Sequence, residues 1–382
     1  MSNGYSINIK EDAELAKLIK GLASKNRAEF EAASEAMAAF IGDTVLQVVE
    51  AAPVISNLFT TVAYNEGSAP SLPLDVYYDI RDKNYLQVWT QSMPGGLATN
   101  FVHGLNELMV STYELDSGIS MLKKYARDAR LDVLSATMER MAQEILIKQE
   151  TVSAGVTSAV LGSATYSPVS GGAARLQGIR ANTAGTFQLH DFNRLITLLQ
   201  RIRPSWVGGT PTGGNVVSHL VASPEIHEDL RAIAYQPQNT RAGSIGGSET
   251  SNTSLAAPDS IREGIFNAAG NVSFFGVELL NVFDLGVGQA YNTLFANYAG
   301  AAAIDGGAQF NAATEECLWA LSLRSNPRAL TRLVERSADN GGVLTTQPDD
   351  SFPMRSEKLG FFSKLREGRV ILDSRNLAFA AV

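Results

Sequence analysis

The chain has 382 residues, 45% hydrophobic and 18% charged, so it can bury a large core and form about two or three lobes. Its formal net charge is −8, whereas a protein that grips nucleic-acid phosphates over most of its surface carries a basic excess. The single cysteine, Cys317, excludes an intrachain disulfide framework and a zinc site made of cysteine pairs.

Targeting and membrane segments are not expected. The first residues lack a charged stretch followed by an apolar one, as a signal peptide would have. The most apolar stretch, residues 38–59, is interrupted by Asp43, Glu50 and Pro53 and is too polar for a membrane span. We therefore expect folding in a reducing cytoplasm, with no membrane partner.

Residues 11–50 are expected to be helical, because Leu15, Leu18 and Leu22 recur at helical spacing and alanine and glutamate are frequent. Pro53 ends this pattern. Such an amphipathic helix belongs either to a core or to an arm that lies on a neighbouring subunit.

A hairpin is expected between residues 72 and 90. Apolar residues alternate with a period of two before the polar loop 81–84, and β-branched and aromatic residues follow it. An isolated two-stranded ribbon is marginal in water, so the hairpin needs a surface to lie on. That surface is either this chain's own sheet or a neighbouring chain.

The longest helix is expected from residue 117 to about residue 150, since neither glycine nor proline interrupts from Ile119 onward. Its roughly 32 residues would make a rod of about 48 Å, longer than the usual helix of a compact domain. One apolar stripe of this helix consists of Leu134, Met138, Met141 and Ile145.

The second half of the chain alternates loops with short elements. Residues 151–186, rich in small and polar residues, predict a long loop, and residues 236–260 a second one. Ser223, Pro224 and Glu225 predict the start of a helix. The other expected elements are a helix at 190–202, a buried strand at 216–221, strands at 272–283 and 290–302, a helix at 312–336 broken near Pro327, and a strand pair within 361–382.

No motif in the sequence carries catalytic chemistry. Glu225 and Glu228 are too near His227 in sequence to share one helix face with it, so a metal site there is disfavoured. The glycine-rich stretch 208–215 lacks the Lys-Ser/Thr of a P-loop, and residues 286–288 lack the third glycine of a dinucleotide fingerprint. We therefore expect no catalytic residue, no cofactor, no metal and no enzyme activity.

The order of these elements, and several short segments, resemble the tailed-bacteriophage major capsid proteins of the Hong Kong 97 fold. The resemblance covers nearly the whole chain from about residue 57, and its evidence is the order of the segments. The segments are 161–163 with 178–179, 221–231 with its proline-initiated helix, 275–280, 294–299 as a strand that folds back, and 367–378.

The resemblance implies an α+β fold of five parts. A long N-terminal region and the stretch 236–260 depart from the family pattern, and no residue matches the Lys–Asn crosslink that some members form. The implied parts are an N-terminal arm (1–56), an extended β-hairpin or E-loop (57–103), a P-domain with the long spine helix (104–203), a mixed α/β A-domain (204–345), and C-terminal strands that return to the A- and P-domains (346–382).

It also implies a major capsid protein that self-assembles as hexamers and pentamers into an icosahedral shell around the phage genome, in a virion assembled in the host cytoplasm. The implied partners are further copies of the chain, a separate scaffolding protein, a portal protein, a cement protein, and packaged DNA bound without sequence specificity. The residues expected at contacts between subunits are Tyr78, Ile80, Arg81, Lys83, Leu86 and Trp89.

Three other interpretations remain open. An encapsulin-like nanocompartment shell shares the fold, although the long N-terminal extension favours the phage protein. A soluble α/β enzyme would use His227 or the loop 208–214. A different virion component, such as a tail or portal protein, would form a tube or ring instead of a closed shell.

Overall fold

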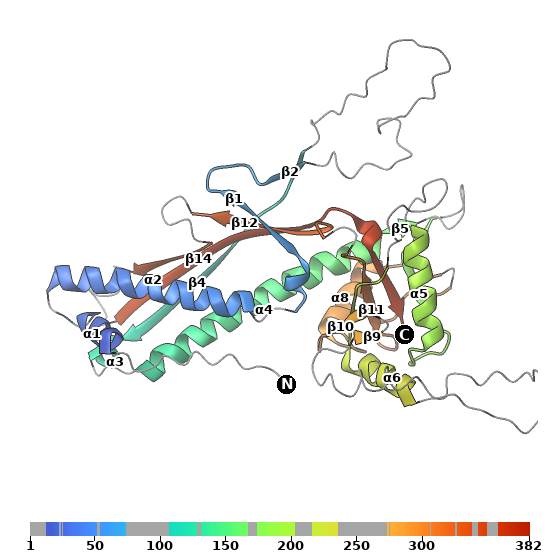
Figure 1. The fold of residues 1–382 in the computed structure, drawn as a ribbon, viewed down its shortest axis with the longest axis horizontal. Helices are drawn as coiled ribbons and strands as arrows, with labels where there is room; N and C mark the ends of the chain where they lie inside the picture. Colours follow the sequence, from blue (N-terminus) through green and yellow to red (C-terminus); the bar gives the residue numbers. More distant parts are fainter. Residues whose placement is uncertain are drawn as a thin grey trace, which may run out of the picture.

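The fold consists of two lobes that share one long helix, α4 (Leu131–Ser163), whose 33 residues span about 50 Å (Figure 1). The computed structural model describes only part of the chain, and the fold is given for that part. The described residues are 13–22, 24, 26–51, 54–73, 107–127, 131–166, 174–202, 216–235, 273–274, 276–305, 307–324, 327–337, 343–349 and 358–382.

The elongated lobe is built on a five-stranded sheet. Across it the order is β1, β12, β14 and β13, and β4 also pairs with β14. β1 and β12 are parallel, and the other pairs are antiparallel. Its strands are β1 (Thr60–Asn65), β4 (Tyr113–Leu122), β12 (Leu330–Arg336), β13 (Leu344–Asp349) and β14 (Lys358–Ile371).

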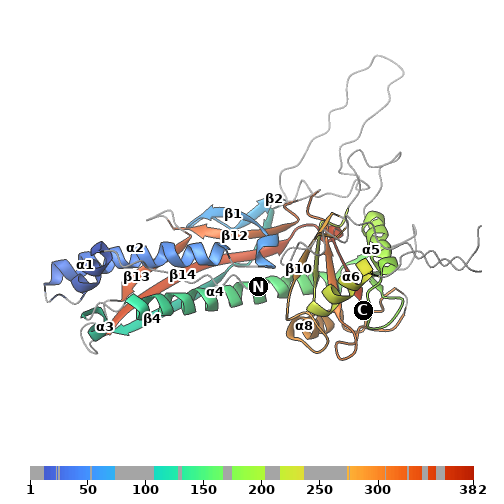
Figure 2. The same ribbon diagram turned by 60° about the horizontal axis from the view of Figure 1, so that its bottom comes forward.

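Helices cover one face of this sheet. Side chains of α1 (Ala13–Leu22), α2 (Arg27–Ala51) and the first half of α4 pack on it in one apolar core. Figure 2 shows α2 and α4 running along the length of the lobe, with the short α3 (Lys123–Arg127) near its end. Because only one face is covered, buried and exposed side chains alternate along much of β14.

The compact lobe is a six-stranded mixed sheet with a core on each face. α5 and α6 pack on one face, and α8 and the second half of α4 pack on the other. In order across the sheet, the strands are β7 (Gly178–Arg180), β15 (Leu377–Ala381), β11 (Cys317–Leu321), β8 (His219–Ala222), β10 (Val277–Asn281) and β9 (Ser273–Phe274). The helices are α5 (Leu189–Ile202), α6 (Pro224–Tyr235) and α8 (Ala290–Ala299).

Short elements complete the described chain. β2 (Ser71–Pro73) pairs with β3 (Glu107–Met109), and β5 (Thr165–Tyr166) pairs with β6 (Arg175–Leu176). The two 3₁₀ turns are η1 (Ser56–Leu58) and η2 (Ser374–Asn376). None of the helices in the described part of the chain is both long and apolar enough to cross a membrane.

Two predicted helices at the start of the compact lobe are confirmed. The helix expected at 190–202 is α5, and the helix expected to start after Ser223 is α6. Ser223 Oγ accepts a hydrogen bond from the backbone N–H of Ile226 at 3.2 Å, so it caps α6 as its residue type predicts. The single helix expected over residues 11–50 is two helices, α1 and α2.

The predicted bounds of the longest helix are wrong at both ends. Residues 113–122 form β4, in which exposed Glu114, Asp116 and Gly118 alternate with half-buried neighbours, and α4 starts only at Leu131. At the other end, the predicted loop after residue 150 is helical up to Ser163. Small residues there allow close packing, since a Cβ on Gly162 would lie 2.7 Å from the backbone nitrogen of Ala299 in α8.

Two further assignments are wrong because tertiary packing overrides local pattern. The strand expected at 290–302 is helix α8. The helix expected at 312–336 is two strands, β11 and β12, and β11 is buried on both faces, so its apolar run shows no alternation. The C-terminal pair does consist of strands, but β14 and β15 belong to different sheets.

Candidate functional site

The residues predicted to contact other subunits lie outside the described residues. They are Tyr78, Ile80, Arg81, Lys83, Leu86 and Trp89. The structure describes the two strands that flank this segment, β2 and β3, which form its base. Leu72 in β2 pairs with Leu108 in β3, so residues 74–106 leave and re-enter the described fold at one place.

This base is fixed to the elongated lobe by close backbone contacts. The backbone N–H of Val110 donates to the carbonyl of Pro70 at 2.9 Å, and the Val110 side chain is buried. A Cβ on Gly368 in β14 would lie 2.9 Å from the carbonyl oxygen of Ser111, so only glycine permits this approach. The chain that follows β3 is therefore packed closely on β14 of the elongated sheet.

The second face of the elongated sheet is covered by no described helix. Phe362 projects from it with 42% of its surface exposed, between its cross-strand partners Gly118 and Gln347. Arg366 and Glu335 form an ion pair on this face at 3.6 Å. This face thus carries charged residues together with the exposed aromatic side chain of Phe362.

The compact lobe also exposes apolar side chains. Phe283, in the turn between β10 and α8, is 76% exposed, and Tyr298 on α8 is about half exposed. Ile147 on α4 is 56% exposed. Neither α8 nor residues 151–163 of α4 contain a charged residue. Tyr298 thus lies on a helix without charged residues, whereas Phe283 and Ile147 have charged neighbours in sequence, Asp284 and Lys148.

Between the two lobes lies a group of polar residues, which we call the polar junction. It consists of the buried Gln149 and Ser153 and the half-buried Glu150 of α4, with the buried Glu367 and Arg369 of β14. The α4 side chains before it, such as Met141, pack in the core of the elongated lobe. Those after it, such as Leu161, pack in the core of the compact lobe. The polar junction is therefore the boundary between two apolar cores.

Glu150 holds the chain that leads from α2 to β1. Its carboxylate accepts hydrogen bonds from the backbone N–H groups of Val54 and Ile55, each at 3.0 Å, and of Ser56 at 3.1 Å. η1 has no side-chain cap of its own, so Glu150 satisfies the free N–H groups at its start. A residue far away in sequence thus fixes the path of this segment.

Glu367 is the centre of the ionic part of the polar junction and is fully buried. Its carboxylate accepts from Arg332 at 2.7 Å, from Arg369 at 3.2 Å, from the amide of Gln149 at 3.2 Å, and from the hydroxyl of Tyr113. Burial, together with the negative charge of Glu367, raises the pKa of Tyr113. Two cations and two neutral donors therefore compensate one buried carboxylate.

Arg369 extends this network to the backbone of α4. Its Nη1 donates to the carbonyl oxygen of Gln149 at 2.5 Å, and its guanidinium lies 5.6 Å from the centre of the Phe59 ring. Burial lowers the pKa of Arg369, and the neighbouring Glu367 opposes that shift. Arg369 thus ties β14, α4 and the segment after η1 together.

The described residues place one serine hydroxyl, that of Ser218, 2.8 Å from a histidine, His219, but Ser218 is buried and its hydroxyl is also bonded to the backbone of Leu321 and Leu323. The described part of the chain contains no group of three or more potential metal ligands. Burial lowers the pKa of His227, and hydrogen bonding to the backbone of Leu280 opposes the shift. Burial also raises the pKa of the Cys317 thiol. The glycine-rich loop 208–214 lies outside the described residues, and Gly288, with φ of +74°, belongs to the turn before α8.

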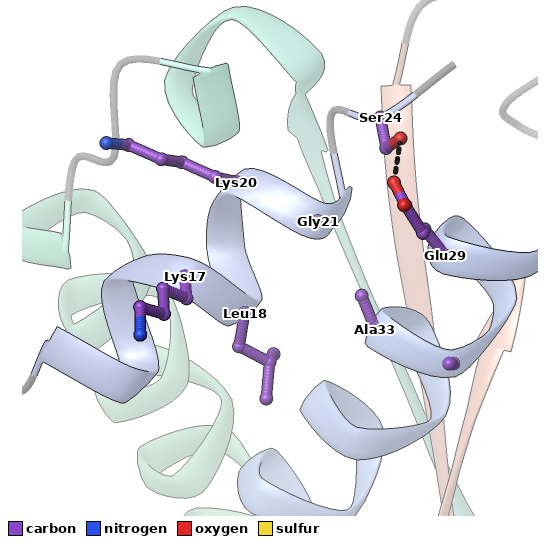
Figure 3. A pocket seen from close by; sticks show the side chains of 8 residues that line it. Lys17, Leu18, Lys20, Gly21, Ser24, Glu29 and Ala33 are labelled. Carbon is purple, nitrogen blue, oxygen red and sulfur yellow. Dashed lines mark hydrogen bonds between the residues drawn. The ribbon is translucent and has the colours of Figure 1, made fainter. Parts of the chain in front are cut away.

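An open groove of about 610 Å³ lies between α1 and α2 (Figure 3). Glu29 on its rim already accepts a hydrogen bond from Ser24 at 2.7 Å. The lining has neither histidine nor cysteine. Its residues are Lys17, Leu18, Lys20, Gly21, Ser24, Glu29, Ala32 and Ala33.

One buried carboxyl in the compact lobe gives a pH-dependent prediction. Glu316 is 7% exposed and accepts a hydrogen bond from Ser223 Oγ at 2.6 Å. Burial raises its pKa, Glu225 and Asp229 raise it further, and the Ser223 hydrogen bond opposes the shift. The fold therefore disfavours the charged form of this carboxyl.

Glu316→Gln is expected to raise the melting temperature at about pH 7 and to leave it nearly unchanged at about pH 4. The pKa of Glu316 in the folded state lies above its unfolded value of about 4.3. The folded state therefore loses stability as the pH rises from the unfolded pKa through the folded pKa. Thermal unfolding at both pH values measures this difference. Glu228→Gln on the exposed face of α6 is the control, and a pH-independent effect of Glu316→Gln would contradict the expectation.

Comparison with known proteins gives matches of structure only. No family model matches the chain, and no curated protein matches it. The holo-SrpI encapsulin complex from Synechococcus elongatus PCC 7942 is similar at 11% identity and a TM-score of 0.41, over 85% of each chain.

Two capsids are similar at a TM-score of 0.45. The capsid of a native GTA particle has 14% identity over 86% of this chain and 89% of that chain. The capsid of Cyanophage P-SCSP1u has 10% identity over 86% of this chain and 88% of that chain.

Proposed function

We propose that this chain is a major capsid protein of the tailed-phage type, whose copies assemble as hexamers and pentamers into an icosahedral shell around a genome. The observation that carries the proposal is its architecture. One helix of 33 residues runs through two lobes with separate cores, and a segment of the chain leaves the elongated lobe from the paired base of β2 and β3.

The five parts implied by the sequence enter this proposal with the same bounds. Residues 1–56 form an arm, 57–103 the E-loop, 104–203 the P-domain with α4 as its spine, 204–345 the A-domain, and 346–382 the returning strands. The proposed partners are further copies of the chain, a separate scaffolding protein, a portal protein and a cement protein. The role is structural, without catalysis.

A shell is stabilised by contacts between its chains, and the exposed apolar side chains described above are suited to form such contacts. Covering ~1,000 Å² of apolar surface is worth about 25 kcal/mol gross, before the cost of ordering. Permanent assemblies use interfaces above the standard size. The exposed Phe283, Tyr298, Ile147 and Phe362 are surfaces that a neighbouring copy can cover.

Packaged DNA is proposed as the content of the shell and not as a tightly bound ligand. The net charge of −8 provides no general attraction for phosphates. An acidic balance lets a shell contain DNA without holding it to the wall.

Leu86→Ser combined with Trp89→Ser is expected to block assembly while the chain still folds. Both residues belong to the segment that the base of β2 and β3 carries, and we propose that they pack on a neighbouring subunit with Tyr78 and Ile80. Electron microscopy and size-exclusion chromatography measure assembly, and circular dichroism measures folding. Gln87→Ser with Thr90→Ser is the matched control. Normal shells from the Leu86, Trp89 variant would overturn this contact.

The proposed function itself is tested by negative-stain electron microscopy of the purified protein, alone and mixed with a candidate scaffold. Closed shells, or hexamers and pentamers, are expected. Shells that enclose a protein cargo and no DNA would instead establish a nanocompartment. A uniform small particle under both conditions would contradict any shell function.

A further inference from the structure

We infer that the polar junction sets the bend of α4, and through it the angle between the two lobes. The effect on a shell rests on the proposed function: the angle between the lobes determines the curvature of the wall and so the diameter of the particle. The residues that act are Ser153 and Arg369, both through the carbonyl oxygen of Gln149.

α4 is held differently on the two sides of the polar junction. Before it, Met138, Met141 and Ile145 are buried against the sheet of the elongated lobe. After it, Ala154 and Leu161 are buried against the compact lobe. Each half of the helix follows its own lobe, so a bend near residues 149–153 changes the angle between the lobes directly.

The carbonyl oxygen of Gln149 accepts hydrogen bonds from two side chains, in addition to its place in the backbone hydrogen-bond ladder of the helix. Ser153 Oγ donates to it at 2.6 Å, and Arg369 Nη1 donates to it at 2.5 Å. A hydroxyl that bonds back to the carbonyl four residues earlier tends to bend a helix, and so does a side chain inserted into the backbone ladder. Both effects act here on one oxygen, and the donor from Arg369 lies on β14.

Arg369 cannot relax away from this contact. Its Nη2 is paired with Glu367, which Arg332 also holds, and its guanidinium lies over Phe59. Its side chain is fully buried. The position of the donor is therefore fixed by β14 and β12, and α4 must adapt to it.

The neighbouring turns of α4 provide a natural comparison. Thr151 Oγ1 donates to the carbonyl of Ile147 at 2.7 Å, and Thr157 Oγ1 donates to that of Ser153 at 2.8 Å. Among the described residues, no arginine donates a hydrogen bond to the carbonyl of Ile147 or to that of Ser153. Thr151 is exposed and has the same local hydrogen bond as Ser153 without the contact to β14. Its side chain also hydrogen-bonds with Tyr291 of α8, a contact within the compact lobe only.

A small bend has a large effect at the ends of the helix. Half of α4 is about 25 Å long, so a change of about 5° displaces its end by about 2 Å. Subunits repeated around a closed shell add such displacements at every contact. The number of subunits that close the shell is then sensitive to this angle.

Ser153→Ala and Arg369→Lys, alone and combined, test the inference, with Thr151→Ala as the matched control. The shells of the test variants are expected to shift in diameter or to broaden in size distribution under cryo-electron microscopy, and those of the control to match the wild type. Wild-type diameters in all variants would overturn the inference. Ser153→Ala removes one hydroxyl only and keeps the test valid if Arg369→Lys does not fold.

A second measurement separates this inference from the proposed function. On the unassembled Leu86→Ser, Trp89→Ser background, small-angle scattering reports the angle between the lobes in a single subunit. A changed scattering profile for Ser153→Ala, with none for Thr151→Ala, supports the inference even if the wild-type protein forms no shell. An unchanged profile for every variant overturns it.

Discussion

Glu367→Ala is expected to lower the free energy of unfolding by about 3–5 kcal/mol, because removing one partner of a buried charge network leaves the others uncompensated. Glu367 is fully buried and accepts hydrogen bonds from Arg332, Arg369, Gln149 and Tyr113. In the variant, the Arg369 guanidinium keeps its charge and loses its counter-ion. Denaturant unfolding of the unassembled chain measures the loss.

Glu114→Ala is the matched control for this prediction. Glu114 lies in β4, which pairs with β14, and it forms an ion pair with Lys364 on the uncovered face of the sheet. Both side chains of that pair are exposed, so its loss is expected to be a small fraction of the Glu367 effect. Equal losses in the two variants would show that the ionic network is not what stabilises the boundary between the lobes.

Phe295→Ala is expected to destabilise the chain by about 3–5 kcal/mol through the cavity that it leaves. Phe295 is fully buried between α8 and the sheet of the compact lobe. Its ring meets Phe310 edge-on at 4.9 Å between centroids and Phe379 at 4.8 Å. The space cannot close easily, because Phe295 lies on α8, Phe379 lies on β15, and the Phe310 ring is buried between elements of the same core.

Phe362→Ala provides the comparison for the same residue type. Phe362 is 42% exposed on the uncovered sheet face, so its removal from an unassembled chain is expected to cost well under half as much. Unfolding by denaturant, with the slope of the transition checked for both variants, measures the difference. A larger loss for Phe362 than for Phe295 would contradict the assignment of the core.

Helices with clear terminal signals could be predicted from the sequence. The start of α6 was predictable because Ser223 and Pro224 each serve a local role at a helix start, and the Ser223 cap confirms it. α5 was predictable because its apolar residues repeat on one face and pack against one core. In both cases the local preference and the tertiary packing agree.

Where a segment is buried on more than one side, the spacing of its apolar residues does not distinguish a strand from a helix. Residues 317–321 form a strand with every side chain buried, so their apolar run resembles a helix as much as a strand. Residues 151–163 look like a loop because they are rich in serine, threonine and glycine. They are helical because packing on the compact lobe overrides this composition: Gly162 lets α8 approach closely, and the hydroxyls of Thr151 and Ser153 find acceptors within the helix.

The candidate site was predictable only in part. The hairpin residues from Tyr78 to Trp89 follow from strand alternation, and they remain a prediction since they lie outside the described residues. The polar junction could not be found, because no motif marks it and its members are far apart. Gln149 and Glu367, which share a hydrogen bond, stand 218 positions apart in the chain.

The place of β15 in the compact lobe affects the timing of folding. β15 lies inside the sheet, between β7 and β11, and Phe379 pairs with Gly178, a contact that closes a loop of about 200 residues. All five side chains of β15 are buried, so the sheet lacks an inner strand until residue 381 has been synthesised. Until residues 377–381 have been synthesised and have paired, β7 and β11 therefore have no strand between them, and the sheet of the compact lobe cannot close.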